Sequence, residues 1–470
     1  MMGVFSAVAS RAGYKDTATQ TNDQINIQEL TRILHCSAAT QEENEQASDE
    51  EVLDEEPKHM LLALISQLRV GMDLHKVTLP TFVLEPRSML ERITDFLSHP
   101  DLIFGYNPIL GEIFRCKYEY PDGSLGFYVA EQVSHHPPIS AFYYVSPTNQ
   151  IEIWGDLRPK SKFLGNSAAT IMEGTSHLRF VDREDDGHYQ ITMPNMLVSI
   201  SFLCLISMLM NIDEYGDRYV RGILFGKMIL ELGDGSRVQT SSNDISCDVE
   251  FKTKGFFGGD YNAIGGKVKD QSGIVGEISG KWNEVMELKR TKGGKTETIF
   301  DASKATVTQK IVVAEQEQDW NESRKLWSKV TRAIKKKDLD AATLAKTAIE
   351  DFQRDRTRTR DENNQKWEPV FFELIEENDQ WKPKFTELKK ELMFISLMDS
   401  RLPEDKEEGI KAVEKFIFDY HSIAPEDNPT DQVSSLPSTS SPSQSQFFPK
   451  IDRRSSITNS EPKRSNSTKK

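Results

Sequence analysis

Residues 126–145, GFYVAEQVSHHPPISAFYYV, carry the strongest structural signals in this chain of 470 residues. Both ends of the stretch are rich in β-branched and aromatic residues, which is typical of strands that pack on a core. His135, His136 and the rigid pair Pro137-Pro138 lie between them. Proline fixes φ, lacks a backbone donor and biases the preceding residue toward an extended backbone. Because adjacent extended residues point to opposite sides, both rings can face one ligand only if the chain bends locally.

The same kind of sequence continues from about residue 107 to residue 300. Segments such as EIFRCKYEY, QIEIWGDL, SCDVEFKTK and IVGEISGKW are rich in β-branched and aromatic residues with alternating polarity. Turn signals separate such segments, at 121–123 (PDG), 234–235 (DG) and 258–260 (GGD). Many short antiparallel strands at this spacing predict a β-rich α+β fold, built on a closed or nearly closed barrel rather than on a parallel sheet.

Helical patterns flank the strand-rich region. Residues 60–70 have apolar residues at helical spacing until Gly71 breaks the pattern, and a short helix follows an extended stretch within 77–97. From Asp319 to about residue 365 a further helical pattern places Trp320, Trp327 and Ile334 on one apolar stripe.

Composition divides the chain into three regions. Residues 1–57 are acidic and lack periodicity, which predicts a disordered N-terminal region. Residues 58–424 are expected to form one large domain, and residues 425–470 a disordered basic tail rich in Ser and Pro. The apolar run at 197–210 is shorter than the roughly 20 residues that a helix needs to cross a bilayer, so a buried or interfacial segment is favoured over a span.

Charge and cysteine usage narrow the class of protein. The net charge of −15 argues against a general nucleic-acid binder, which would present a basic field. The four cysteines lie far apart without a CxxC pair, so neither a zinc ribbon nor a disulfide framework is predicted. The first residues lack a basic segment followed by a long apolar one, so we expect no signal peptide. The sparse cysteines fit free thiols in a reducing compartment, as expected for a cytoplasmic protein.

Lys346, Glu350 and Arg354 recur every four residues in the later helical pattern and therefore share one helix face. One interpretation is an exposed ladder of ion pairs, which contributes about a few tenths of a kcal/mol per pair. The other is an anion site in which Glu350 orients two cations, because arginine offers a planar fork for phosphate oxygens and lysine a compact charge. Spacing alone leaves both interpretations open.

The pair His135 and His136 also has several interpretations. Metal binding needs further ligands at set spacing, and none accompanies the pair. Catalysis needs an activated nucleophile, and Ser134 lies in no GxSxG elbow. As phosphate ligands the rings would donate hydrogen bonds, and a phosphomonoester would favour their protonated form. A structural role at a barrel turn is the remaining alternative. A metal- or serine-dependent hydrolase is the least favoured function, because no complete catalytic set accompanies the pair, and we predict no enzyme, no metal site and no cofactor.

The octapeptide 131–138, EQVSHHPP, is the fingerprint of the oxysterol-binding-protein-related lipid-transfer family, which this chain resembles. Further matching segments are NPILGE (107–112), KSKFLGNS (160–167), GILFGKM (222–228), FKTKGFFGGDYNAI (251–264), SGKW (279–282) and WEPVFF (367–372). The resemblance covers about residues 60–400. It implies a large, incomplete antiparallel β-barrel around a hydrophobic lipid tunnel, with an N-terminal lid at about residues 60–80 and C-terminal helices.

The resemblance also implies how a lipid is held. Members of the family exchange phosphatidylinositol 4-phosphate for a sterol or phosphatidylserine between membranes. The implied ligands of the 4-phosphate are Asn107, His135, His136, Lys346, Glu350 and Arg354, with Ser161 as a further polar headgroup contact.

The stretch at 64–91, LISQLRVGMDLHKVTLPTFVLEPRSMLE, most resembles the phosphatidylserine-carrying branch of the family. It favours phosphatidylserine as the second lipid, with a sterol next. The expected partners are therefore membrane lipids, reached by peripheral contact where the endoplasmic reticulum meets the plasma membrane or at other contact sites.

Two features depart from the family pattern. The family has a lysine three positions before Asn107, where this chain has Phe104, and the helix that normally precedes NPILGE is missing because residues 99–102 run almost directly into Phe104. Residues 197–218 also intervene between MPNM and YVRGILFGKM, which indicates an insertion into a barrel connection. Both departures suggest a splice or gene-model variant. The alternative function is therefore a phosphoinositide or sterol sensor or scaffold with little transfer activity.

Overall fold

A computed structural model describes residues 86–96, 106–163, 167–181, 187–200, 228–240, 242, 244–254, 259–304, 308–384 and 403–422. These residues all belong to a unit that spans residues 1–431. The predicted disordered regions at 1–57 and 425–470, the predicted lid at 60–80 and the predicted missing helix before Asn107 lie outside the described residues, and so do the domain boundaries near 57 and 424.

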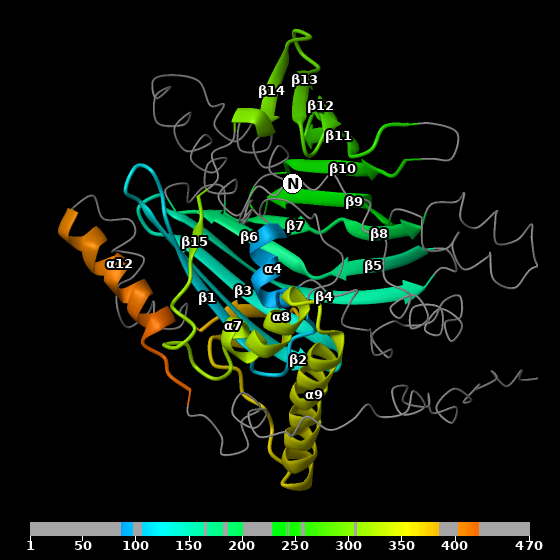
Figure 1. The fold of residues 1–470 in the computed structure, drawn as a ribbon. Coiled ribbons are helices and arrows are strands. Elements are labelled where there is room, and N and C mark those ends of the chain that lie inside the picture. Colours follow the sequence, from blue (N-terminus) through cyan, green and yellow to red (C-terminus); the bar gives the residue numbers. More distant parts are fainter. Residues whose placement is uncertain are drawn as a thin grey trace, which may run out of the picture. The chain divides into compact units, whose positions relative to one another are not determined.

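Strands dominate the described part of the chain (Figure 1). The large sheet contains β1 Ile113–Glu119, β2 Leu125–His135, β3 Pro138–Ser146, β4 Ile151–Phe163, β5 Ser167–Glu173, β6 Thr175–Phe180, β7 Tyr189–Thr192, β8 Asn195–Ile200, β9 Met228–Thr240, β10 Ser246–Lys252, β11 Ala263–Asp270, β12 Gly273–Lys281, β13 Val285–Arg290, β14 Thr296–Asp301 and β15 Lys310–Ile311. A separate hairpin contains β16 Phe372–Ile375 and β17 Gln380–Pro383. The helices are α4 Met89–Phe96, α7 Ser323–Leu326, α8 Ser328–Lys335, α9 Leu339–Glu362 and α12 Pro403–Phe418, with a 3-10 turn, η4, at Ala302–Lys304.

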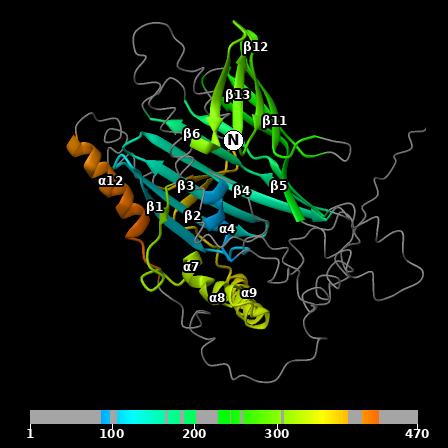
Figure 2. The same ribbon diagram turned by 45° about the horizontal axis from the view of Figure 1, so that its top comes forward.

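The large sheet has 15 strands and is open. Its main order is β14-β13-β12-β11-β10-β9-β7-β6-β4-β3-β2-β1-β15, and neighbouring strands are antiparallel. In the described part β14 and β15 stand at opposite ends of this order and do not pair with each other. Figures 1 and 2 both show β1–β4 on one side of the sheet and β11–β13 at the other end. The prediction of a β-rich, incompletely closed antiparallel architecture is confirmed.

Two long strands, β4 and β9, each change partners along their length. Residues 151–155 of β4 pair with β6, while residues 158–163 pair with β5. Similarly, residues 228–233 of β9 pair with β8 and residues 238–240 with β7. Because β5 also pairs with β8, two separate routes of strands join β4 to β9.

The predicted turn at Asp234-Gly235 is wrong, because both residues lie inside β9. Asp234 has a left-handed backbone, φ 61°, and follows the last residue of β9 that pairs with β8. Its carboxylate accepts a hydrogen bond from Asn195 Nδ2 at 2.6 Å. The Asp-Gly signal therefore marks a residue with positive φ within one strand instead of a reversal between two.

The proposed insertion at 197–218 begins inside a strand. Residues 197–200 complete β8, where Leu197 pairs with Glu231 of β9 and Ala169 of β5. The rest of the insertion lies outside the described residues. The first part of the apolar run thus continues the sheet. Within the described part of the chain, no helix has both the length and the apolar character needed to cross a membrane.

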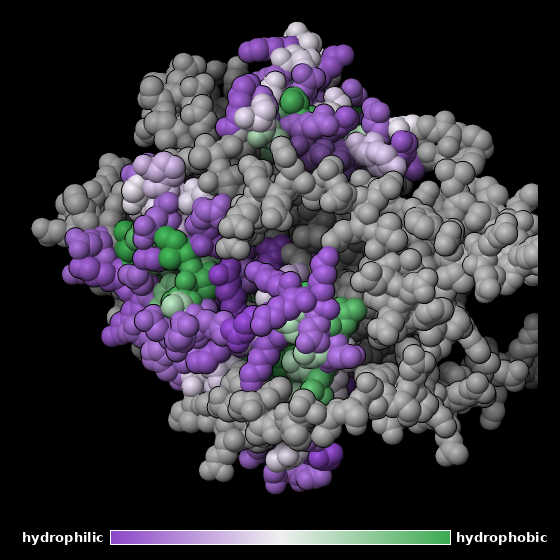
Figure 3. All heavy atoms as spheres, viewed as in Figure 1, coloured by the Kyte–Doolittle hydropathy of each residue, from purple (hydrophilic) through white to green (hydrophobic). Residues whose placement is uncertain are grey.

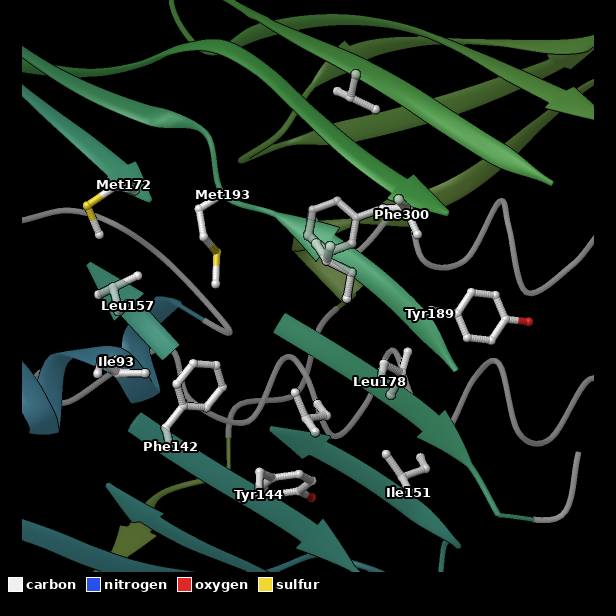
Figure 4. Close-up of a cluster of buried hydrophobic side chains, with 14 of the residues drawn as sticks. Ile93, Phe142, Tyr144, Ile151, Leu157, Met172, Leu178, Tyr189, Met193 and Phe300 are labelled. Carbon is white, nitrogen blue, oxygen red and sulfur yellow. The ribbon is translucent and has the colours of Figure 1, made fainter. Parts of the chain in front are cut away.

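The main core lies on the inner face of the large sheet. Figure 4 shows Phe142 of β3, Leu157 of β4 and Met172 of β5 in this cluster, near Ile93 of α4 and Met193. Each of these side chains is at most 6% exposed. Short β-branched and aromatic strands thus build an apolar interior.

A second cluster covers the other side of β2 and β3. Phe127 and Val129 of β2 pack with Phe372 of β16 and with Val413 and Ile417 of α12. All five side chains are fully buried. Figures 1 and 2 show α12 lying along the β1 side of the sheet.

The predicted helical pattern after Asp319 is confirmed, although it is divided among α7, α8 and α9. Lys337, with φ 58°, lies between α8 and α9. Asp338 then caps α9 by accepting a hydrogen bond from Ala341 N at 3.0 Å. Trp327, Val330 and other apolar residues of α7–α9 form a third cluster. These helices lie at one end of β1–β4 in both ribbon views.

The described residues on the face in Figure 3 are mostly hydrophilic, with one group of hydrophobic side chains near β15 and smaller groups elsewhere. Ile311 of this short end strand is 41% exposed.

Candidate functional site

One cavity of about 1290 Å³ brings together every residue predicted to hold a headgroup. Its lining includes Asn107, His135, His136, Ser161, Lys346, Glu350 and Arg354. These residues come from the loop before β1, the β2–β3 hairpin, β4 and α9. The structure therefore assembles the set from four distant segments, while the role of the residues as lipid ligands stays a prediction.

The β2–β3 hairpin contains the bend that the two histidines require. Pairing shifts between Gln132 and Ser134, so Val133 forms a bulge that turns the strand end. Gln132 stabilises this bulge, because its Nε2 donates to Ser134 O at 2.8 Å and its Oε1 accepts from Ser140 Oγ at 2.5 Å. The His136–Pro137 peptide is cis.

His135 has a defined orientation within the cavity. Its Nδ1 lies 3.1 Å from Pro108 O, and only a protonated Nδ1 can form a hydrogen bond with a carbonyl oxygen. The Nε2 of the neutral ring is then an acceptor. Partial burial lowers the pKa of His135, and the neighbouring His136, whose ring centroid lies 4.6 Å away, lowers it further. An anion next to Nε2 would favour the doubly protonated ring.

The opposite wall is the α9 row. Lys346 Nζ contacts Glu350 Oε1 at 2.5 Å, and Arg354 Nη2 lies 3.4 Å from Glu350 Oε2. Arg354 also pairs with Asp351. The Lys346 side chain is 11% exposed and that of Arg354 is 60% exposed. The row is thus more than a surface ladder, because its first cation is largely buried beside the cavity.

The loop that carries Asn107 is fixed by a buried acid at its end. The Glu112 carboxylate accepts hydrogen bonds from Ile109 N at 3.1 Å, Ser323 Oγ at 2.7 Å, Trp327 Nε1 at 2.9 Å and Ser88 Oγ. Burial nevertheless raises the pKa of Glu112 above its ordinary value. These bonds join the loop to α7, to Trp327 between α7 and α8, and to the residue before α4.

Several cavity residues escaped the sequence-based prediction. Gln353 of α9 is buried and accepts a hydrogen bond from Leu110 N at 3.2 Å, which ties α9 to the Asn107 loop. Thr170 of β5 exchanges a hydrogen bond with Ser161 at 3.1 Å. Gln353 is separated from Leu110 by 243 residues, so no local sequence pattern predicts the contact.

The side chains that line the cavity indicate which kind of ligand it can hold. Among the residues that the structure describes, no three His, Cys, Asp or Glu side chains are arranged to hold a metal ion. Ser134 Oγ donates a hydrogen bond to the backbone oxygen of Pro137 at 2.7 Å. The cavity presents imidazoles, a lysine and an arginine, which is a set suited to binding a phosphate group.

An open antiparallel sheet with an apolar interior and a polar cavity beside it defines a β-rich ligand-binding domain. The chain belongs to the oxysterol-binding protein family, whose model matches residues 63–104 and 105–392. The two matched segments meet between Phe104 and Gly105, where the sequence predicts a missing helix.

Relatives from several eukaryotes support this membership. An oxysterol-binding protein homolog of Schizosaccharomyces pombe is 37% identical over 429 residues, which cover 82% of this chain and 84% of that protein. Oxysterol-binding protein homolog 7 of Saccharomyces cerevisiae is 39% identical over 352 residues, covering 67% and 75%. Oxysterol-binding protein-related protein 5 of Homo sapiens is 36% identical over 367 residues, which cover 70% of this chain and 39% of that longer protein.

Solved structures share the fold. The crystal structure of the Osh1 ORD domain in complex with cholesterol has a TM-score of 0.50 and 21% identity, over 80% of this chain and 98% of that one. The same domain in complex with ergosterol gives a TM-score of 0.50 and 19% identity, over 83% and 97%. The described sheet is thus the architecture of a known lipid-binding domain.

Proposed function

We propose that this protein exchanges phosphatidylinositol 4-phosphate for a second lipid between membranes and performs no covalent chemistry. The observation that carries the proposal is the convergence of the seven predicted headgroup residues on one cavity. A phosphomonoester is the headgroup that this set suits best, because it offers several charged acceptors to imidazole, ammonium and guanidinium donors.

The division between cavity and core supports transfer of a whole lipid. Charge-assisted hydrogen bonds at the cavity would select the headgroup. The apolar interior would bury acyl or sterol surface at about 25 cal/mol per Å². A difference in phosphoinositide concentration between two membranes would then supply the free energy to move the second lipid.

We favour phosphatidylserine as the second lipid and place a sterol next. The support is the resemblance of residues 64–91 to the phosphatidylserine-carrying branch. We further propose a cytoplasmic protein that contacts membranes peripherally, where the endoplasmic reticulum meets the plasma membrane or at other contact sites. The proposed lipid-binding domain at 58–424 contains both segments of the family match.

Transfer between liposomes tests the proposal. Donor liposomes would contain phosphatidylinositol 4-phosphate, and acceptors would contain phosphatidylserine or a sterol. We expect each lipid to move against the other, with phosphatidylserine moving faster than the sterol. Extraction of the sterol without phosphatidylserine would overturn the preference, and failure to extract the phosphoinositide would overturn the proposed exchange.

A second candidate is a sensor or scaffold that binds phosphoinositide but transfers little. Phe104 occupies the position where the family has a phosphate-binding lysine, and the family match divides next to it. This function predicts binding to phosphoinositide liposomes without movement of either lipid. Restoring the cation by Phe104→Lys would then raise phosphoinositide affinity, whereas an unchanged affinity would argue against a role for this position.

A further inference from the structure

Two stretches that match the family have no assigned role in headgroup binding. One is the start of the octapeptide EQVSHHPP, at Glu131 and Gln132, and the other is residues 367–372, WEPVFF. The structure brings them into direct contact although they are 239 residues or more apart. Both segments also reach the cavity, because its lining includes Gln132 from the first and Trp367 from the second.

Glu131 binds the backbone of the second segment. Its Oε1 accepts a hydrogen bond from Val370 N at 2.8 Å, and its Oε2 accepts from Phe371 N at 2.8 Å. The Glu131 side chain is fully buried. One carboxylate thus fixes two successive peptide groups between Pro369 and Phe372, which both line the cavity, and it lies four residues before His135 on the same strand.

No cation donates directly to this carboxylate within the described part of the chain. Burial raises the pKa of Glu131 to about 7, while Lys384 and the two backbone bonds lower it. Lys384 Nζ instead donates to Pro369 O at 2.5 Å. The charge of Glu131 in turn contributes to the raised pKa of Tyr420, after the larger effect of burial. A buried acid is costly to keep, so its use to hold the 367–372 segment points to a positional role.

Trp367 extends this contact to the rest of the site. Gly111, with φ +79°, leaves room for the indole, because a Cβ at that position would lie 2.5 Å from two ring carbons. The Arg360 guanidinium of α9 lies over the Trp367 ring, 5.7 Å from the ring centroid. Trp367 therefore packs between the Asn107 loop and α9, the two elements that carry most of the predicted phosphate ligands.

We propose that Glu131 and Trp367 are positioning residues for the headgroup cavity. Glu131 holds the 367–372 segment on β2, and Trp367 sets the spacing between the Asn107 loop and α9. The inference rests on the proposed phosphoinositide binding. It assigns to both residues an effect on headgroup affinity that exceeds their effect on binding of the second lipid.

The first test compares Glu131→Gln with Glu152→Gln in the full chain. Glu152 is a matched control, because it is also a buried strand glutamate, but it bonds to Tyr143 and Arg179, neither of which lines the cavity, and not to the 367–372 segment. Affinity for phosphatidylinositol 4-phosphate and for phosphatidylserine would be measured with liposomes, together with the midpoint of thermal unfolding. We expect Glu131→Gln to weaken phosphoinositide binding about tenfold, with a smaller change for phosphatidylserine.

A second variant keeps the inference testable if Glu131→Gln does not fold. Trp367 is only partly buried, so Trp367→Ala should fold, and Trp282→Ala is the control for loss of a partly buried indole away from the cavity. We expect about a tenfold loss of phosphoinositide affinity for Trp367→Ala alone. Equal losses for both lipids, or unchanged phosphoinositide affinity in Trp367→Ala, would overturn the positioning role. Absence of phosphoinositide binding in the wild-type protein would instead overturn the proposed function.

Discussion

The apolar interior and the polar cavity are built in opposite ways. The main core draws buried side chains from most strands of the large sheet, and many of them make similar contacts. The cavity depends on seven predicted ligands from four segments, each with its own hydrogen-bond partners. A change in the core should therefore alter stability and all lipids together, whereas a change in the cavity should alter one headgroup. The comparison predicts that stability and selectivity can be separated.

The largest expected effect concerns the core. Phe142→Ala removes a ring that is 2% exposed, and it should lower the free energy of unfolding by about 3–5 kcal/mol. Urea unfolding would measure the loss. Tyr261→Ala, at a side chain 39% exposed, should change stability by less than about 0.5 kcal/mol. A change in the ratio of the two lipid affinities in Phe142→Ala would contradict the proposed separation of stability from selectivity.

The next effect concerns the histidine pair. His135→Ala/His136→Ala should weaken phosphatidylinositol 4-phosphate binding about 100-fold or more, because two hydrogen bonds to a charged group are lost. Binding of phosphatidylserine and the unfolding midpoint should change little. His421→Ala is the control, since this exposed residue contacts Asp319 and does not line the cavity. Retained phosphoinositide binding in the double variant would contradict the headgroup assignment.

Within the α9 row, the buried cation should contribute more to phosphoinositide affinity than the exposed one. Lys346→Ala should weaken phosphoinositide binding about tenfold, because the ammonium is largely buried beside the cavity. Arg354→Ala should cost about two- to threefold, because the guanidinium is 60% exposed and solvent screens it. Liposome binding at several salt concentrations would measure both losses. A larger effect for Arg354 would show that it moves into the cavity when lipid binds.

The smallest effect concerns pH. A phosphomonoester should bind best when His135 is doubly protonated, and the lipid-free protein holds the pKa of His135 below its usual value. Phosphoinositide affinity should therefore rise about threefold as the pH falls from 7.5 to 6.5, while phosphatidylserine affinity stays constant. His135→Gln should remove this dependence, whereas a profile unchanged by the substitution would assign the titration to another group.

The sign is opposite for stability. In the lipid-free protein, His135 lowers stability as the pH falls below the ordinary histidine pKa, because the unfolded chain then binds a proton that the folded protein excludes. Bound phosphoinositide should offset this loss. Thermal unfolding with and without lipid at pH 6 and pH 8 would measure the difference.

Sequence reasoning was most successful where a property is local. Strand composition predicted β1–β4, β10 and β12, and a four-residue spacing placed Lys346, Glu350 and Arg354 on one face. The family resemblance, not the residues alone, joined that face to the histidine pair. Local patterns failed at Asp234-Gly235, because a left-handed residue can serve a strand as well as a turn. They also missed Glu131 and Gln353, whose partners are more than 200 residues away.

The double connection between β4 and β9 affects where the length of the chain can vary in this family. Residues 201–227 connect β8 to β9 in the sequence, and β8 belongs to the route that runs through β5 and β8. The other route, through β6 and β7, joins the same two strands by its own hydrogen bonds. Chain length can thus vary on one route while the second preserves the register that leads to the signature hairpin. The sheet thus separates the hairpin that carries His135 and His136 from the connection where the sequence predicts an insertion.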